Sequence, residues 1–133
     1  MLVAVWVLIL LAGIVHVVVF VCEAFLIDRP IVYSGLFRLP AYDPAIRLWA
    51  FGVGFYNLFI GLGAIASVVL WASGQDVAGR TLAIYLMSLM LLAALALVVA
   101  DRMGLGRERG KGLGGSVGQG LVPLLALVGI ALA

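Results

Sequence analysis

The sequence predicts an all-α polytopic membrane protein, with four transmembrane helices in a bundle. Of its 133 residues, 66% are hydrophobic and only 11% are charged, and the mean hydropathy is +1.31. Soluble domains are about 45–50% apolar and about 25% charged. A small soluble fold leaves too much of its surface in water to hide this composition. The apolar residues are also grouped in runs of the length that a spanning helix needs, roughly 20 residues.

Four continuous apolar runs give the predicted spans, which are 2–27, 48–72, 81–100 and 115–133, with Gln75 as an alternative start of the third. The runs are rich in Leu and Ala and lack the alternating pattern of a membrane β-barrel, so helices are favoured. The connections that remain are too short for a separate soluble domain. We therefore expect residues 1–133 to form a single transmembrane domain.

The basic residues predict one fixed orientation in the membrane. Three lie in the first connection, four in the third and one, Arg80, in the second. With four spans the first and third connections share a side, and the positive-inside rule places that side in the cytoplasm. Both termini are then outside, in a plasma membrane or a bacterial inner membrane. The sequence pI of about 9.0 follows from these loops, and no nucleic-acid partner is expected.

The first connection, residues 28–47, is too apolar to be fully exposed to water. It carries three prolines and several aromatic and aliphatic residues. We expect it to lie at the interface as a short helical or re-entrant piece, and the alternative is a lid over a cavity between the helices. Asp43 followed by Pro44 predicts the N-cap and first residue of the second spanning helix.

The third connection is rich in glycine and basic residues. Gly110, Gly112 and Gly115 match the pattern G-x-G-x-x-G, but no strand precedes them and no acidic residue follows at the required distance. Nucleotide binding is therefore not expected. The interpretation we favour is a flexible basic loop that faces anionic lipid.

A few polar residues inside the spans are the candidate site, because polar groups at membrane depth need a partner or a purpose. His16 and Glu23 are seven residues apart, which places them within about 20° on one helix face and roughly 10 Å apart along the axis. Counting helical rise predicts two layers. His16 and Asn57, with Ser88, would lie near the midplane, and Glu23 and Gln119 would lie closer to the loops. Tyr56 is adjacent to Asn57 and joins the candidate set.

No pattern in the sequence supports other site chemistry. One His, one Glu and one Asn do not make a metal cluster, and no metal or cofactor is expected. There is no Ser-His-Asp or Cys-His arrangement and no carboxylate pair, so the sequence gives no motif for an enzyme.

At these residues the chain resembles a family of small four-helix membrane proteins, the domain of unknown function thirteen-oh-four. The resemblance rests on three segments: HVVVFVCEAFL with His16 and Glu23, the Gly54-x-Tyr56-Asn57-x-Phe59 segment, and GQGLVPLLAL with Gln119 and Pro123. The match spans most of the chain in order. Gly52 and Val53 stand where the family often has an Asn-Gln pair. The resemblance implies the four-helix architecture and no established activity.

The leading functional hypothesis is a module that binds or moves a small lipophilic molecule, such as a quinone or a lipid. An apolar pocket with few polar groups suits such a ligand, and its residues would be His16, Glu23, Tyr56, Asn57 and Gln119. One alternative is a proton-coupled small exporter. Another is a structural subunit of a larger membrane complex, and assembly as a homo-oligomer is compatible with each hypothesis. In every case the lipid bilayer is the immediate partner.

Overall fold

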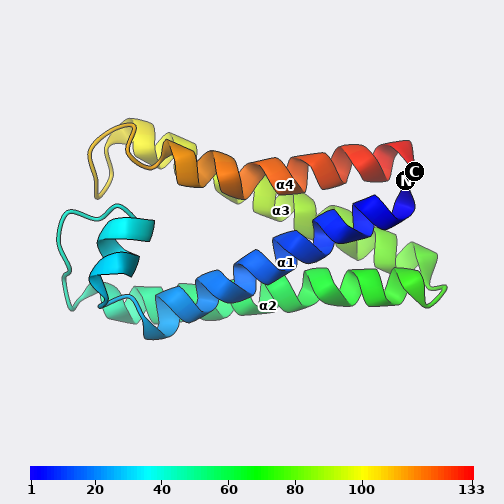
Figure 1. The fold of residues 1–133 in the computed structure, drawn as a ribbon, viewed down its shortest axis with the longest axis horizontal. Coiled ribbons are helices and arrows are strands. Elements are labelled where there is room, and N and C mark those ends of the chain that lie inside the picture. The colour runs from blue at the N-terminus through cyan, green and yellow to red at the C-terminus, as the bar shows by residue number, and fades with distance from the viewer.

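The computed structural model describes residues 1–133 and is entirely helical (Figure 1). Its elements in chain order are α1 (Leu2–Phe25), the short π-helix η1 (Ile31–Leu36), α2 (Ile46–Ala72), α3 (Asp76–Met103) and α4 (Leu113–Leu132). The four long helices are each long and apolar enough to cross a membrane. The predicted four-helix bundle is confirmed, and the chain is a multi-pass membrane protein.

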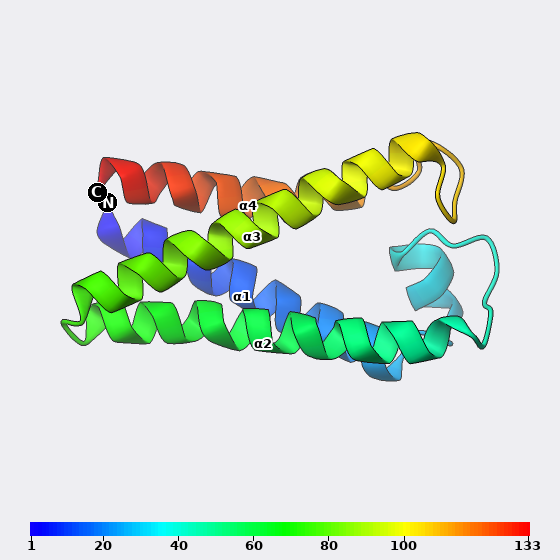
Figure 2. The same ribbon diagram turned by 180° about the vertical axis from the view of Figure 1, so that it is seen from behind.

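The structure has two distinct ends. Both termini and the tight turn between α2 and α3 lie at one end, which we call the terminal end (Figure 1). η1 and the loop between α3 and α4 lie at the opposite end, which we call the loop end. α2 and α4 run along opposite edges of the bundle, and α1 and α3 cross it diagonally (Figure 2). The helices therefore change neighbours from one end to the other.

Polar residues extend α3 at its start. α3 begins at Asp76, next to the alternative start at Gln75 and before residue 81, because Asp76 is a favourable acid for a first helical turn. Arg80, one turn later, donates from Nη2 to the backbone oxygen of Ile130 at 2.9 Å and so ties α3 to α4 at the terminal end. Gly104, in the left-handed conformation with φ 72°, ends α3.

The start of α2 corrects one prediction. Asp43 is not its N-cap, since the helix begins at Ile46. Asp43 Oδ1 instead accepts a hydrogen bond from the backbone N–H of Ala45 at 2.8 Å, within the turn that precedes the helix. Short polar side chains such as Asp commonly stabilise turns in this way.

Tight packing is concentrated in the terminal half of the bundle. Twelve buried apolar residues form one core there, including Ile9, Met87 and Ile130. The loop half has only a small cluster of three buried residues, Ile27, Val32 and Ala50. The two halves therefore differ, and the loop half leaves space between the helices.

Glycines bring α1 and α2 into backbone contact. A Cβ atom added to Gly61 would lie 2.6 Å from the backbone oxygen of Gly13, and one added to Gly13 would lie 2.9 Å from that of Gly61. Near the loop end, a Cβ on Gly54 would lie 3.2 Å from the backbone N of Ala24. Small residues permit this close approach in membrane helix pairs. The spacing of α1 and α2 is thus fixed along most of their length.

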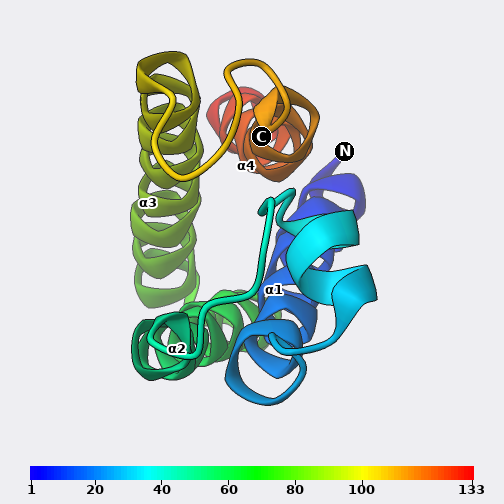
Figure 3. The ribbon, with the colours of Figure 1, turned by 90° about the vertical axis from the view of Figure 1, so that its left-hand side faces the viewer.

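The first connection folds back on the loop end rather than extending from it. When the bundle is viewed from the loop end, η1 lies in front of it on the side of α1 (Figure 3). Val32 is buried in the cluster with Ile27 and Ala50, and Tyr33, Phe37 and Tyr42 pack around it. The expectation of a short helical piece is confirmed, and its aromatic residues are held against the bundle.

Candidate functional site

Glu23 of α1 and Asn57 of α2 form a hydrogen-bonded pair within the loop half. Asn57 donates from Nδ2 to Glu23 Oε2 at 2.7 Å. Both side chains are partly buried. The neutral amide of Asn57 is the only group that donates to this carboxyl group, and no basic side chain forms an ion pair with Glu23.

The helix geometry explains why these two residues meet. The prediction placed Asn57 near the midplane and Glu23 close to the loops, and this separation into two layers is wrong. Counting helical rise assumed that neighbouring helices end at the same level. α2 instead runs past the end of α1 at the loop end (Figure 2). Gly54, one turn before Asn57, also lets α1 come close at Ala24.

A groove opens beside this pair at the loop end, with a volume of about 240 Å³. We call it the loop-end groove. It is walled by apolar and aromatic side chains from the end of α1, the first connection and the start of α2. Two charged residues also line it. The nine lining residues are Glu23, Ile27, Phe37, Leu39, Ile46, Trp49, Ala50, Val53 and Arg107.

Arg107 enters the groove from the loop between α3 and α4 and is held by a buried carboxylate. Its Nε donates to Asp101 Oδ1 at 3.3 Å, and its Nη1 donates to the backbone oxygen of Phe37 at 3.0 Å. Asp101 is fully buried. The Arg107 guanidinium therefore links α3, its following loop and the first connection at the edge of the groove.

The glycine-rich loop closes around the same carboxylate. The backbone N–H of Gly110 donates to Asp101 Oδ2 at 2.7 Å, and that of Gly112 donates to Asp101 Oδ1 at 2.8 Å. Backbone N–H groups of a glycine-rich loop can surround an anion, and here the anion is a side chain of the protein itself. This segment is therefore folded onto Asp101, and its flexibility and its contact with anionic lipid stay predictions.

Sequence reasoning missed Asp101 and Arg107 because it treated both as ordinary surface charges at a helix end. One signal was available. Several glycines follow Asp101 within a dozen residues, and Gly104, Gly106 and Gly110 adopt positive φ angles. Such glycines allow the chain to turn back sharply, here onto the end of α3.

The other predicted site residues lie elsewhere. Tyr56 is 69% exposed on the outer surface of α2, because adjacent residues on a helix point about 100° apart. His16 is buried, only 4% exposed, and its Nδ1 lies 2.9 Å from the backbone oxygen of Ala12. Gln119 is partly buried and lies on α4. None of these three side chains lines the loop-end groove.

Gln119 has a distinct backbone feature. Pro123 lies inside α4 and has no N–H to donate to the carbonyl four residues earlier, which is that of Gln119. The backbone oxygen of Gln119 thus lacks the N–H donor that the regular helix would supply.

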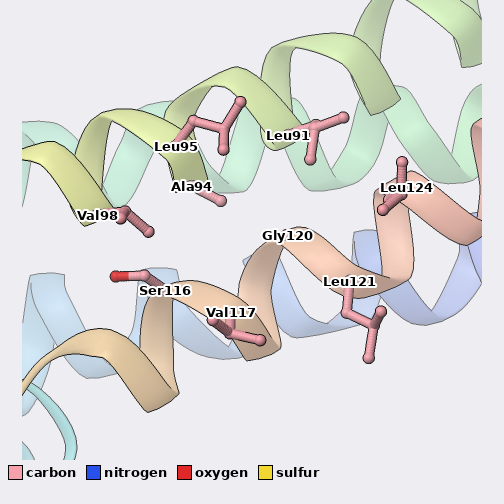
Figure 4. A pocket seen from close by; sticks show the side chains of 9 residues that line it. All are labelled: Leu91, Ala94, Leu95, Val98, Ser116, Val117, Gly120, Leu121 and Leu124. Atoms are coloured by element: carbon pink, nitrogen blue, oxygen red, sulfur yellow. The ribbon is translucent and has the colours of Figure 1, made fainter.

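A second groove, of about 190 Å³, runs between α3 and α4 (Figure 4). Its lining is almost wholly aliphatic, with Leu91, Ala94 and Val98 on one side. Ser116 is its one polar side chain, and this hydroxyl donates to the backbone oxygen of Gly112 at 3.1 Å. This groove has no charged group to orient a ligand, so the loop-end groove is the stronger candidate site.

The site has no arrangement that would bind a metal ion. No three side chains of His, Cys, Asp or Glu converge anywhere in the structure. The chemistry that the loop-end groove can offer is hydrogen bonding and charge at one end of an apolar surface.

The family model described as Protein of unknown function (DUF1304) matches residues 10–131. The chain belongs to this family. The matched segment contains every residue of the loop-end groove and the Asp101 carboxylate behind it. No curated protein and no solved structure matches the chain. Membership of this family supports the four-helix architecture and assigns no activity to the loop-end groove.

Proposed function

We propose that this protein binds a small lipophilic molecule with a polar head, quinone- or lipid-like, in the loop-end groove. The observation that carries the proposal is the combination of a mostly apolar groove with the Glu23–Asn57 pair at its side. Ligand sites typically combine apolar walls with a few polar groups that orient the ligand.

The lining of the groove favours an amphiphile over a compact polar solute, since seven of its nine residues are hydrophobic. Ligand pockets usually measure about 300–1,000 Å³, and the loop-end groove is smaller, about 240 Å³. It would hold a head and the first few carbons of a chain. The remaining chain would extend along the outside of α2, where Val53 and Trp49 are largely exposed.

The position of the groove fits entry from the membrane. Trp49 lines it and lies at the start of α2, and tryptophan favours the headgroup level of a bilayer. A polar head beside Glu23 would therefore remain near the interface while its chain stays in hydrocarbon. This arrangement supports binding from the lipid phase.

Thermal stabilisation of the purified protein tests the proposal, with a short-chain ubiquinone and monolaurin as probes. Val53→Trp fills the groove at a position that is 46% exposed, and Val69→Trp places the same side chain at a 61% exposed position elsewhere on α2. We expect at least one probe to raise the melting temperature of the wild type and of Val69→Trp, with a much smaller effect on Val53→Trp. Equal shifts in both tryptophan variants would refute the groove as the site.

A further inference from the structure

Two ionisable side chains line the loop-end groove, and only one of them has an ionic partner within the protein. We propose, on the basis of the function proposed above, that the ligand is an amphiphile whose polar head is a cationic amine. The groove contributes one carboxylate, that of Glu23, and one guanidinium, that of Arg107. Which charge is left unpaired decides the charge of the head that fits.

The positive charge of Arg107 is already neutralised. The guanidinium pairs with the buried carboxylate of Asp101 and also donates to the Phe37 carbonyl. It packs so closely on Gly112 that a Cβ at this position would overlap it, and its side chain is only 18% exposed. An anionic head would have to compete with Asp101 for this cation.

The carboxyl group of Glu23 has no such ionic partner. The three ion pairs of the structure are Arg29 with Asp28, Arg107 with Asp101 and Lys111 with Glu108. The Glu23 carboxylate accepts one hydrogen bond, from the neutral amide of Asn57. Charged groups that are partly removed from water are stabilised by a paired charge, and an ammonium head would supply both the charge and a charge-assisted hydrogen bond.

The aromatic and aliphatic walls of the groove are also compatible with an amphiphilic amine. Phe37 and Trp49 line it beside the aliphatic residues, and aromatic rings attract ammonium groups through cation–π interaction. The basic side chains of the first connection do not oppose this. Arg29, Arg38 and Arg47 are exposed to solvent and are not lining residues, so water and salt weaken their repulsion.

A series of three probes with one alkyl chain isolates the charge of the head. Octylamine, octanol and octanoate are titrated calorimetrically at neutral pH into the full chain in a nonionic detergent, with detergent-only titrations subtracted. We expect octylamine to bind about tenfold more tightly than octanol, since hydrogen bonds to charged groups contribute more than neutral ones. Octanoate should bind most weakly.

Matched variants assign the effect to Glu23. Glu23→Gln keeps an acceptor for Asn57 and should remove the advantage of octylamine over octanol. Glu108→Gln removes the same charge from an exposed residue outside the groove and should preserve that advantage. If Glu23→Gln fails to fold, the order of the three probes in the wild type still decides the question.

The outcomes separate this inference from the proposed function. Equal binding of octanol and octylamine, or tightest binding of octanoate, would overturn the cationic head. Octanol binding that Val53→Trp abolishes and Val69→Trp retains would nevertheless leave the groove standing as a ligand site. If no probe distinguishes the two tryptophan variants, both proposals fail.

Discussion

Asn57 of α2 donates a hydrogen bond to Glu23 of α1 at 2.7 Å, and it is the one hydrogen bond between side chains of two spanning helices. The pair joins α1 and α2 where their backbones are already close and where the loop-end groove opens. The Glu23–Asn57 pair therefore has two roles. It holds two helices together, and it presents a carboxyl group to the groove.

The structural part of the pair can be measured. Asn57→Ala removes the donor to a partly buried carboxylate, so we expect the free energy of unfolding to fall by about 1–2 kcal/mol. The double-mutant cycle with Glu23→Gln should give a coupling energy of about 0.6 kcal/mol and not more than roughly 1.7 kcal/mol. Unfolding in mixed detergent micelles followed by circular dichroism provides the numbers. A coupling energy of zero would show that the two side chains do not interact.

Close approach of α1 and α2 at Gly61 predicts a sharp difference between two glycines of the same helix. Gly61→Ala places a Cβ against the backbone oxygen of Gly13, whereas Gly52 has nothing within 4 Å. We expect Gly61→Ala to lower the free energy of unfolding by about 1–3 kcal/mol, the usual cost of overpacking. Gly52→Ala should be neutral or slightly stabilising, because alanine has the higher helix propensity. Equal effects would contradict the close contact.

Arg107 should protect the loop between α3 and α4 from proteolysis. Arg107→Ala removes the link between Asp101 and the Phe37 carbonyl, so the loop should open more often. We expect trypsin to cleave beside Arg109 and Lys111 about tenfold faster, the factor that follows from losing one strong charged hydrogen bond. Arg102→Ala, at an exposed residue with no ion pair, is the control and should leave that rate unchanged. Unaltered cleavage of Arg107→Ala would mean that the loop is held by other contacts.

The basic residues predict the direction of the bundle in its membrane. The loop end carries seven of the eight basic residues, five in its connections and two, Arg47 and Arg102, at the adjoining helix ends, so this end should face the cytoplasm. In a Cys22→Ser background, Ser73→Cys at the terminal end should react with an impermeant maleimide on intact cells. Glu108→Cys at the loop end should react only after permeabilisation. The opposite labelling pattern would reverse the orientation.

The architecture could be predicted from the sequence because long apolar runs have few alternatives in a bilayer. All four spans are present, and α3 extends beyond 81–100 at both ends, with its first residue next to the alternative start at Gln75. Polar residues at helix ends caused this difference, since Asp76 and Arg80 are helical and not apolar. Composition therefore identifies the residues that lie in the hydrocarbon core of the membrane, but it does not identify the residue at which a helix begins.

The candidate site was predicted only in part. Glu23 and Asn57 were singled out as costly polar groups, and the structure pairs them. Their contact could not be derived, because it depends on how far α2 extends past α1. Tyr56 was included for its position in a motif, but its outward direction depends on which face of α2 packs inward. Asp101 and Arg107 were missed because their burial arises from the path of a loop.

The most direct test of the loop-end groove as a ligand site is native mass spectrometry of the protein released from the membrane in which it was expressed. We predict that the wild type and Val69→Trp carry one lipophilic molecule per chain, that Val53→Trp carries none, and that Glu23→Gln carries less than the wild type. A wild-type chain released without any bound molecule, or equal occupancy in Val53→Trp and Val69→Trp, would contradict the account.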